Sequence, residues 1–401
     1  MENEDKIKEL LTRGVERIYP NAEFLEQKLR SGEKLSLYLG IDPTGPTLHL
    51  GHLIPILKLL QFQNLGHKVT LLVGDFTATI GDPTDKLAPR TALSAKEVTA
   101  NAKGYKKQAA RILAFEGKNP AMLRRNSEWL NTLPMAEMFS LLSNLTYAQI
   151  IKRDMFQERI KEGKDLNANE LLYPALQGYD SVAIDVDGEV GGNDQTFNML
   201  MGRDLLKKLR GKEKFVVSMK MLADSFGKKM GKTEGNRVSL DEKPSEMFGK
   251  IVSWPDGMIL PAFELCTTVP LAEIAEVKKG LESGANPKTA KEKLAESIVS
   301  LYYGTKKAVK AREAFESTFS ERKLPADIKE FKTEAGAVLS DCLLAAGIVA
   351  SKGEWRRLVE EKAVSSVASN GGLEKILDVN FKISGPAVFK IGKHRFLKVV
   401  M

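Results

Sequence analysis

Residues 35–52 read LSLYLGIDPTGPTLHLGH, and this stretch decides the fold class of the N-terminal half of the chain. Its first five residues, 35–39, predict a buried strand, and a loop rich in proline and glycine follows over residues 42–46. An apolar helix pattern then runs from 48 to about 65, and a second strand pattern covers 69–73. Strand, helix and strand in this order form a βαβ unit, so we expect a parallel sheet covered by helices.

Further strand patterns continue this sheet. Apolar and β-branched residues occur over Ser181–Ile184 with Glu189–Val190, and again over Phe215–Ser218. The helical pattern of Asn198–Leu209 separates the two. We therefore predict an α/β fold, with a Rossmann-like, nucleotide-binding parallel-sheet domain over residues 1–238.

The C-terminal part has a different pattern. Residues 239–325 are helical and rich in charge, which predicts an α-helical domain. We expect a linker over 326–336 and a small α+β domain over 337–401. In that last domain, residues 353–362 have the spacing of an amphipathic helix, and 388–400 predict a terminal hairpin with basic side chains facing outward.

The composition is typical of a soluble globular protein of two or three domains. The chain has 401 residues, of which 43% are hydrophobic and 28% charged. No run approaches the ~18–20 apolar residues that span a bilayer. The polar start MENEDKIKEL does not resemble a signal or transit peptide. Cys266 and Cys342 are too few for a disulfide framework, so we expect a reducing, cytoplasmic location and no membrane partner.

The net charge of +8 is mild, but its distribution is uneven. Residues 335–401 hold ten Lys/Arg against six Asp/Glu, a net charge of +4, and residues 382–401 hold five basic residues and no acidic one. A basic terminal domain suggests a polyanionic partner, although solubility alone also explains a mild excess.

His49 and His52 lie three residues apart at the start of the first predicted helix, and three interpretations compete. A zinc site needs three or four ligands, but His67 and His394 are distant in sequence and no CxxC is present, so a metal pair is disfavoured. Two residues that make only local hydrogen bonds at a helix start are the simplest alternative.

Anion binding is the third interpretation and fits the local sequence best. A strand, a Pro/Gly loop and a helix start direct free backbone N–H groups and the positive end of the helix dipole at one point, which favours phosphate. Gly51 would let a ligand approach the backbone, and the imidazole N–H groups of His49 and His52 would stabilise charge on a reacting phosphate.

The stretch Tyr38–His52, YLGIDPTGPTLHLGH, resembles the HIGH signature of class I aminoacyl-tRNA synthetases, in the form found in tyrosyl-tRNA synthetases. In that family the two histidines stabilise the ATP phosphates while the amino acid is activated. A HxGH string alone also occurs in other nucleotidylyltransferases.

A second motif supports the resemblance. Lys228–Thr233, KKMGKT, is similar to the family's KMSKS loop, with Gly231 at the first serine position. It is not a phosphate-binding P-loop, because only three residues separate Gly227 from Gly231. A solvated lysine cluster is the simple alternative, and the histidine motif makes it less favoured. The resemblance implies that Lys229 and Lys232 are point charges on the leaving pyrophosphate.

Residues 173–180, YPALQGYD, and 191–195, GGNDQ, resemble the amino-acid pocket of the same family. Without the flanking motifs they would be core aromatics on a helix and a turn. The resemblance implies that Tyr173, Gln177 and Asp82 hold the α-amino group of tyrosine, that Tyr38 and Asp180 bind its phenol hydroxyl, that Asp194 binds the ATP ribose, and that Gln195 lies near the substrate carboxylate.

The resemblance thus predicts a set of site residues. The catalytic residues are His49, His52, Lys229, Lys232 and Thr233. ATP would contact Gly40, Asp42, Thr44, His49, Gly51, His52, Asp194, Lys229, Met230 and Lys232. Lys86 and Arg90 match basic residues that the family places near pyrophosphate or the tRNA terminus. Mg²⁺ would accompany ATP, and no structural metal is expected.

The C-terminal residues 340–359 are similar to the S-four-like RNA-binding domain of bacterial tyrosyl-tRNA synthetases, and Lys352, Arg356 and Arg357 would contact RNA. The family implies tyrosine, ATP and tRNA(Tyr) as partners, and a homodimer with its interface around residues 125–160. The predicted activity is a tyrosine–tRNA ligase. A tryptophan-type synthetase, another nucleotidylyltransferase and a non-catalytic RNA-binding relative are the alternatives.

Overall fold

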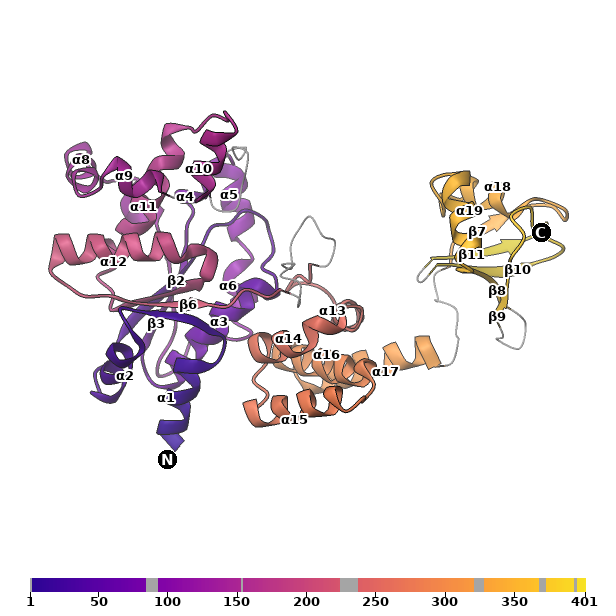
Figure 1. Ribbon diagram of the computed structural model, residues 1–401, viewed down its shortest axis with the longest axis horizontal. Coiled ribbons are helices and arrows are strands. Elements are labelled where there is room, and N and C mark those ends of the chain that lie inside the picture. The colour runs from indigo at the N-terminus through magenta and orange to yellow at the C-terminus, as the bar shows by residue number, and fades with distance from the viewer. Residues whose placement is uncertain are drawn as a thin grey trace. The chain divides into compact units, whose positions relative to one another are not determined.

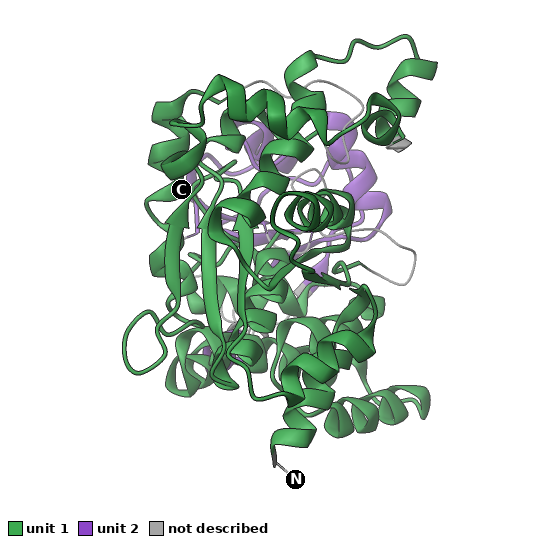
Figure 2. Ribbon diagram, turned by 90° about the vertical axis from the view of Figure 1, so that its left-hand side faces the viewer, with its two compact units in different colours: residues 1–311 green, residues 312–401 purple. Residues whose placement is uncertain are grey.

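The structure is a computed structural model that describes residues 2–83, 93–152, 154–223, 237–320, 328–367, 373–392 and 395–401. It divides into two compact units, residues 1–311 and 312–401 (Figure 2). The first unit contains both the predicted sheet and the predicted helical region. Within the described residues, no helix is both long enough and apolar enough to cross a membrane.

The first unit is built on a six-stranded sheet with the strand order β1-β6-β5-β2-β3-β4. Five strands are parallel, and β1 alone pairs antiparallel, with β6. The sheet is the Rossmann-like frame that the sequence predicts. The strands are β1 (Val15–Tyr19), β2 (Ser36–Ile41), β3 (Lys68–Val73), β4 (Met122–Arg125), β5 (Gly188–Gly192) and β6 (Phe215–Met219).

Helices cover both faces of this sheet (Figure 1). Helix α3 (Leu50–Asn64) connects β2 to β3, whereas α12 (Thr196–Arg210) connects β5 to β6 in the opposite direction along the sheet. Because such crossovers are right-handed, the two helices lie on opposite faces. Helix α3 is apolar nearly all round, and its side chains at Leu53, Ile56 and Phe62 are fully buried.

One predicted strand is wrong. Ser181–Ile184 forms the last turn of α11 (Ala168–Ile184), and only Gly188–Gly192 forms a strand, β5. A short apolar run has no period that separates a strand from a buried helix segment, and here the run continues the helix that carries Tyr173. The helix ends at Asp185, which adopts a left-handed conformation with φ 55°.

The other helices of the sheet region are shorter than α3, α11 and α12. They are α1 (Glu2–Thr12), α2 (Ala22–Arg30), α4 (Thr77–Ile80), α5 (Ala95–Ala102), α6 (Tyr105–Ala109), α7 (Ser127–Leu130), α8 (Met135–Ser143), α9 (Tyr147–Ile151), α10 (Asp154–Lys161) and the 3-10 turn η1 (Asn193–Gln195).

The helical region packs onto the sheet region through α14, which contacts α3. Its elements are α13 (Pro244–Val252), the 3-10 turn η3 (Asp256–Met258), α14 (Ile259–Cys266), α15 (Leu271–Glu282), α16 (Pro287–Tyr303) and α17 (Thr305–Ser320).

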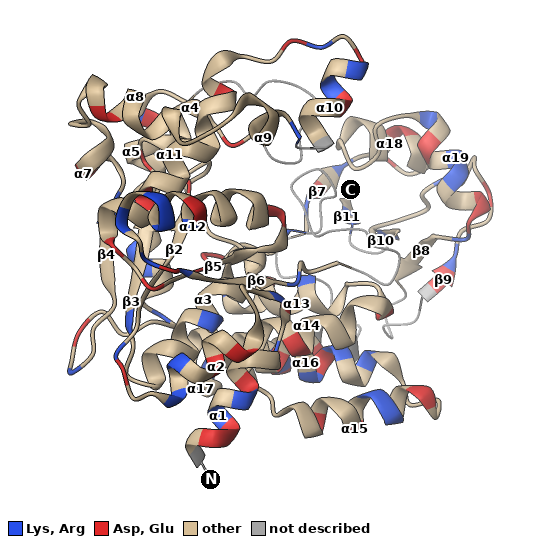
Figure 3. Cartoon of the chain, turned by 60° about the vertical axis from the view of Figure 1, so that its left-hand side comes forward, with Lys and Arg blue, Asp and Glu red and all other residues tan. Residues whose placement is uncertain are grey.

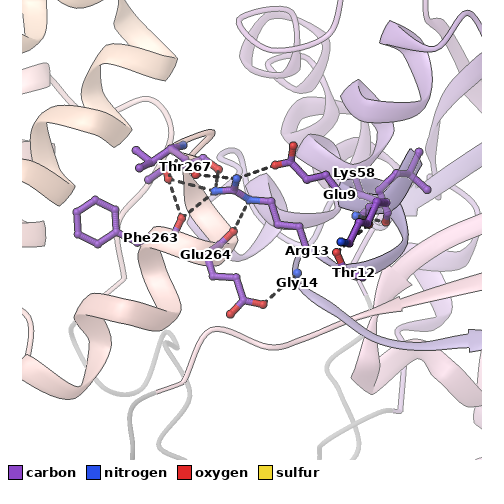
Figure 4. A network of polar contacts seen from close by, with 11 residues as sticks. Glu9, Thr12, Arg13, Gly14, Lys58, Phe263, Glu264 and Thr267 are labelled. Atoms are coloured by element: carbon purple, nitrogen blue, oxygen red, sulfur yellow. Dashed lines mark hydrogen bonds and ion pairs between the residues drawn. The ribbon is translucent and has the colours of Figure 1, made fainter. Parts of the chain in front are cut away.

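The buried guanidinium of Arg13 joins the two regions, and we call its contacts the Arg13 clamp (Figure 4). Its Nε donates to the carbonyl of Glu264 (2.9 Å), and its terminal nitrogens donate to the carbonyls of Phe263 (3.2 Å), Thr267 (2.7 Å) and Val269 (2.8 Å). One of them also donates to the Glu9 carboxylate at 2.8 Å. Arginine satisfies the carbonyls at the end of α14 because its fork holds several donors in a fixed plane.

The second unit has a five-stranded sheet with the order β7-β11-β10-β8-β9. Its core includes Trp355, whose indole N–H donates to the Val379 carbonyl at 2.8 Å. The predicted helix and terminal hairpin are present as α19, β10 and β11. The elements are β7 (Glu330–Lys332), α18 (Leu339–Ala345), α19 (Lys352–Glu360), β8 (Val364–Val367), β9 (Leu373–Lys375), β10 (Ala387–Ile391) and β11 (Arg395–Val400).

The range 326–336, expected as a linker, includes a strand. Glu330–Lys332 pairs in parallel with Lys398–Val400 and forms the edge of the second sheet. The segment is charged and short, so the sequence shows no strand pattern, and its partner strand lies at the far end of the chain. The other proposed domain limits, 238/239 and 325/326, stay predictions.

Candidate functional site

The candidate site lies where the direction of the sheet connections reverses. Strand β2 is followed by a crossover toward β3, and β5 by a crossover toward β6, so the switch point falls between β2 and β5. Open parallel sheets bind ligands at this place, beyond the carboxyl ends of the strands. Asp42 follows β2 here, and Asp194 and Gln195 follow β5.

The two histidines of the predicted phosphate site begin α3. The Nδ1 of His49 accepts from the Gly51 N–H at 3.1 Å, and the Nδ1 of His52 accepts from the His49 N–H at 3.2 Å, so each side chain caps the helix. A neutral imidazole that accepts at Nδ1 carries its proton on Nε2. Local capping and phosphate binding are therefore compatible, because the caps set the tautomer in which Nε2 donates.

The structure shows a local steric reason for glycine at position 51, separate from the predicted close approach of a ligand. A Cβ at this position would lie 2.8 Å from Cε1 and 2.9 Å from Nδ1 of His49. The missing side chain thus makes room for the His49 ring, whose centroid lies 3.9 Å from that of His52.

The Pro/Gly loop before the histidines is held by side chains from α5 and α6. Asn101 donates to the Pro43 carbonyl at 3.0 Å, Tyr105 donates to the Gly45 carbonyl at 2.8 Å, and Gln108 accepts from the Leu48 N–H at 2.8 Å. Gly40 lies exposed in β2, and the Thr44 N–H closes a tight turn onto the Asp42 carbonyl at 2.8 Å.

The predicted lysine motif, with Lys229, Met230, Lys232 and Thr233, lies outside the described residues, as do Lys86 and Arg90. The segment that follows the motif does pair with the histidine segment. The Leu50 N–H donates to the Val238 carbonyl (3.1 Å), and the Leu240 N–H donates to the Leu48 carbonyl (2.8 Å). The chain therefore returns to the histidine motif directly after the lysine motif.

Asp42 joins two elements at the base of the site. Its Oδ1 accepts from the Thr77 hydroxyl at 2.8 Å, and its Oδ2 accepts from the Tyr173 hydroxyl at 2.9 Å. A Cβ at Gly74 would lie 2.0 Å from that Oδ1, so glycine is required there. Burial, together with the charges of Asp42 and Asp82, raises the pKa of Tyr173 well above its ordinary value. Tyr173 is therefore a neutral hydroxyl at the base of the site.

Two more of the predicted residues meet beside it. The Gln195 side-chain amide donates to Asp82 at 2.7 Å and to Asp194 at 3.4 Å. Gln177 lies one helical turn after Tyr173, and among the described residues its buried Oε1 has no hydrogen-bond partner. An unpaired buried acceptor is costly, so this atom favours a ligand with N–H groups.

Asp180 is buried on α11 and is held by two residues that sequence reasoning missed. Trp129 donates its indole N–H to Oδ1 at 2.9 Å, and Asn126 donates to Oδ2 at 3.3 Å. Asn126 also donates to Thr77 and accepts from the Phe76 N–H. Burial raises the pKa of Asp180 well above its usual range, and these two hydrogen bonds oppose that rise. The carboxyl group keeps lone pairs for a further partner.

Tyr38 lies in β2 near this carboxyl group and is also buried. Its hydroxyl lies 2.9 Å from the Ser181 Oγ. Burial, and then the charges of Glu189 and Asp180, raise the pKa of Tyr38 well above 10, so its hydroxyl stays protonated at neutral pH. Two protein hydroxyls and a carboxyl group thus form a buried polar floor.

Comparison with known proteins identifies the family. The family model described as tRNA synthetases class I (W and Y) matches residues 30–320. The chain belongs to this family of class I tRNA synthetases. A tyrosine–tRNA ligase of Carboxydothermus hydrogenoformans is 42% identical to this class I synthetase, over 98% of this chain and 97% of that one. A tyrosine–tRNA ligase of Oleidesulfovibrio alaskensis is 40% identical over the full length of both chains.

Solved structures show the same fold at lower identity. A truncated mitochondrial tyrosyl-tRNA synthetase of Coccidioides posadasii superposes with a TM-score of 0.64 at 24% identity, over 77% of this class I synthetase and 91% of that chain. The tyrosyl-tRNA synthetase of Archaeoglobus fulgidus, solved with L-tyrosine, has a TM-score of 0.59 at 22% identity, over 78% of this chain and 100% of that one.

The second unit of this class I synthetase carries the predicted RNA-binding residues on α19 (Figure 3). Arg356 and Arg357 are exposed, whereas Trp355 on the other side of the helix is buried. Lys352 is also exposed and lies 3.0 Å from Asp341. The helix thus presents the guanidinium groups of Arg356 and Arg357 and the ammonium group of Lys352 to solvent. Arg357 lies 3.9 Å from Glu361.

Proposed function

We propose that the chain is a tyrosine–tRNA ligase. It activates tyrosine with ATP to tyrosyl-adenylate and pyrophosphate, and then transfers the tyrosyl group to the 3′-terminal adenosine of tRNA(Tyr). Relatives with this name align over nearly the whole chain at 38–42% identity. The observation that carries the choice of tyrosine is the buried polar floor of Tyr38 and Asp180, which suits a ring hydroxyl at the end of an amino-acid pocket.

In the activation step a carboxylate oxygen of tyrosine attacks the α-phosphorus of ATP. A new oxygen–phosphorus bond forms, and the bond to the bridging oxygen breaks, so that pyrophosphate leaves with the electron pair. No covalent enzyme intermediate is needed, and the residues act by positioning and by stabilising charge. His49 and His52 donate from Nε2 to phosphate oxygens, and Asp194 binds the ribose hydroxyls.

The other proposed contacts to ATP follow the family resemblance. Gly40, Asp42, Thr44 and Gly51 lie along the loop and helix start that face the nucleotide. Lys229, Met230, Lys232 and Thr233 supply the lysine motif, and Lys86 and Arg90 contact pyrophosphate or the tRNA end. Mg²⁺ would come with ATP and neutralise phosphate charge. Within the described residues, no three His, Cys, Asp or Glu side chains gather to hold a metal.

Tyrosine is recognised at both ends. Tyr173, Gln177 and Asp82 bind its ammonium group, and the unpartnered Gln177 Oε1 supports this assignment. Gln195 lies near its carboxylate. Tyr38 and Asp180 bind its ring hydroxyl, and phenylalanine would leave these buried groups unpaired, an effect for which tyrosyl-tRNA synthetase is itself the standard example.

Pyrophosphate exchange into ATP, measured with each of the twenty amino acids, tests the proposal. We expect exchange with tyrosine, and a loss of about 10²–10³-fold in rate for His52→Ala and for Lys232→Ala, because each removes a donor to the reacting phosphates. Lys243→Ala is the matched control, because Lys243 is an exposed lysine just beyond the motif.

The outcomes separate the alternatives. Exchange with tryptophan in place of tyrosine would make the chain a tryptophan-type synthetase. Exchange that needs a different acceptor would make it another nucleotidylyltransferase. RNA binding without exchange for any amino acid would make it a non-catalytic relative.

We also propose a homodimer that uses residues 125–160. Large apolar side chains of α8 to α10 are strongly exposed: Met135 by 70%, Phe139 by 66%, Tyr147 by 69% and Ile160 by 47%. Clustered exposure of this kind is typical of an interface. Phe139→Asp should halve the mass measured by light scattering, whereas Leu271→Asp, on α15, should leave it unchanged. A wild-type mass equal to one chain would exclude the dimer.

The second unit is proposed as an S-four-like RNA-binding domain. Replacing Arg356 and Arg357 by glutamine should weaken tRNA binding and reduce the slope of log K against log salt by roughly 0.7–0.9 for each lost phosphate contact. The matched control replaces Lys278 and Lys279, which are exposed on α15. An unchanged slope would remove these arginines from the RNA contact. With tRNA as a partner and two buried free cysteines, a cytoplasmic location is proposed.

A further inference from the structure

A buried lysine lies behind the polar floor of the pocket. Lys214, just before β6, is fully buried, and its Nζ donates to the Glu189 carboxylate at 2.5 Å and to the Ser181 Oγ at 2.7 Å. Ser181 in turn lies 2.9 Å from the Tyr38 hydroxyl. An ion pair inside the sheet region is thus connected through one serine to a proposed substrate-binding hydroxyl.

The chemistry of these groups sets the direction of the hydrogen bonds. An ammonium group only donates, so Ser181 accepts from Lys214 and must place its own proton elsewhere. Among the described residues, the Tyr38 oxygen is the acceptor within reach. If Tyr38 donated to Ser181 instead, the serine proton would stay buried without an acceptor, which costs about 1–3 kcal/mol. The order is therefore Lys214 to Ser181 to Tyr38.

The packing of α11 against α12 is adapted to this arrangement. A Cβ at Gly202 would lie 2.7 Å from the Ser181 Oγ and 2.8 Å from the Lys214 Nζ. Glycine at this position of α12 gives the ammonium group and the hydroxyl the space in which they meet.

The stability of the fold alone does not explain why an ion pair is buried at this place. Replacing a buried ion pair by apolar residues of similar volume is often neutral or stabilising. Both members of the pair act on the hydroxyl of Tyr38: Lys214 reaches it through Ser181, and the Glu189 carboxylate accepts a side-chain hydrogen bond from it. Since the ring hydroxyl of the substrate must meet that group, its orientation matters for recognition.

We propose that Lys214 and Ser181 are positioning residues that determine specificity for tyrosine over phenylalanine, by holding the Tyr38 hydroxyl for the substrate ring hydroxyl. This inference rests on the proposed function. It predicts that loss of Ser181 affects the amino acid with a ring hydroxyl and spares the one without it.

The test compares kcat/KM for tyrosine and for phenylalanine in pyrophosphate exchange. Ser181→Ala should lower kcat/KM for tyrosine about tenfold and leave that for phenylalanine within about twofold, since it removes one buried hydrogen bond. Combined with Tyr38→Phe, it should cause no further change in the ratio, because the hydroxyl that it positions is gone. The paired change of Lys214→Met with Glu189→Met should lower the ratio at least as much as Ser181→Ala without leaving a lone buried charge, because Glu189 also accepts a side-chain hydrogen bond from Tyr38.

The paired change of Arg159→Met with Glu170→Met is the matched control, because Arg159 and Glu170 form another buried ion pair in the same unit, at 2.7 Å. It should leave the ratio unchanged. Equal losses for both amino acids in Ser181→Ala, or an unchanged ratio, would overturn the inference while the proposed function stands. If Tyr38→Phe itself leaves the ratio unchanged, the proposed tyrosine site is wrong and the inference fails with it.

Discussion

Two buried polar networks in the first unit differ in the groups that form their hydrogen bonds, mainly backbone carbonyls in one and side chains in the other. In the Arg13 clamp, one guanidinium group donates to four backbone carbonyls at the end of α14 and to Glu9. At the floor of the pocket, Asp180 accepts from the side chains of Trp129 and Asn126, and Tyr38 contacts the side chain of Ser181.

This difference separates a structural network from the one proposed to bind substrate. Backbone carbonyls are fixed by the helix that carries them, so the Arg13 clamp has one arrangement and stabilises the fold. Side-chain hydroxyl and carboxyl groups keep spare lone pairs or protons and can accept a ligand as a further partner. In addition, burial raises the pKa of both Asp180 and Tyr38, and such strongly shifted groups are common at functional sites.

The largest expected effect is on activity, from Asp180→Asn. The amide keeps the size of the side chain but accepts at one end only, so either Trp129 or Asn126 loses its acceptor, and we expect the free energy of unfolding to fall by only about 1 kcal/mol. It also removes carboxylate acceptor capacity at the position proposed for the ring hydroxyl of tyrosine, and kcat/KM for tyrosine should fall by about 100-fold or more. Pyrophosphate exchange and thermal unfolding measure the two quantities. A variant that is strongly destabilised but keeps its kcat/KM for tyrosine would show that Asp180 is structural rather than functional.

The opposite result is expected for Arg13→Met. Several buried carbonyls lose their donor, so the free energy of unfolding should fall by roughly 2–4 kcal/mol. Arg13→Lys should recover only part of that loss, because a single ammonium group cannot replace the fork. Denaturant unfolding measures both variants. The ratio of kcat/KM for tyrosine to that for phenylalanine should stay unchanged, and a change in it would connect the clamp to recognition.

The smallest expected effect is a pH dependence of stability that arises from a lysine beside the Arg13 clamp. Lys58 lies beside the clamp on α3, and its Nζ donates to the Leu10 carbonyl at 2.6 Å. Burial lowers the pKa of Lys58 to about 7, and the charge of Arg13 also lowers it. Above that pH the folded protein holds fewer protons than the unfolded chain. Stability relative to the Lys58→Met variant should therefore rise by up to about 1.4 kcal/mol per pH unit from pH 7 upward.

Urea unfolding of both proteins between pH 6 and 9 measures this difference. Parallel stability curves for wild type and Lys58→Met would mean that Lys58 stays charged when folded. Asp180 should show the opposite dependence on pH. Because its pKa is raised, the folded protein holds more protons at this carboxyl group than the unfolded chain does, so its contribution to stability falls as the pH rises.

Sequence motifs predicted the α/β fold, the Rossmann-like sheet and the synthetase family, and these predictions are confirmed. They succeed because the histidine segment is local, with a strand end, a loop and a helix start adjacent along the chain. The predicted strand at 181–184 failed because a short apolar run has no period to distinguish helix from strand.

The partners of the polar floor could not be predicted in this way. Trp129 and Asn126 follow β4, a short edge strand with two arginines and no strand pattern. Tyr38 and Ser181 lie 143 residues apart in sequence. Lys214 would be read as one of many surface lysines, and nothing local shows that α11, α12 and β6 enclose it.

The sequence by itself determined the class of protein and the parallel-sheet frame that carries the histidine segment, because these depend on local spacing. Only the tertiary structure decided which buried donor meets which acceptor. A polar group removed from water depends on the partner that faces it, and in this chain those partners come from strands and helices far apart in the sequence.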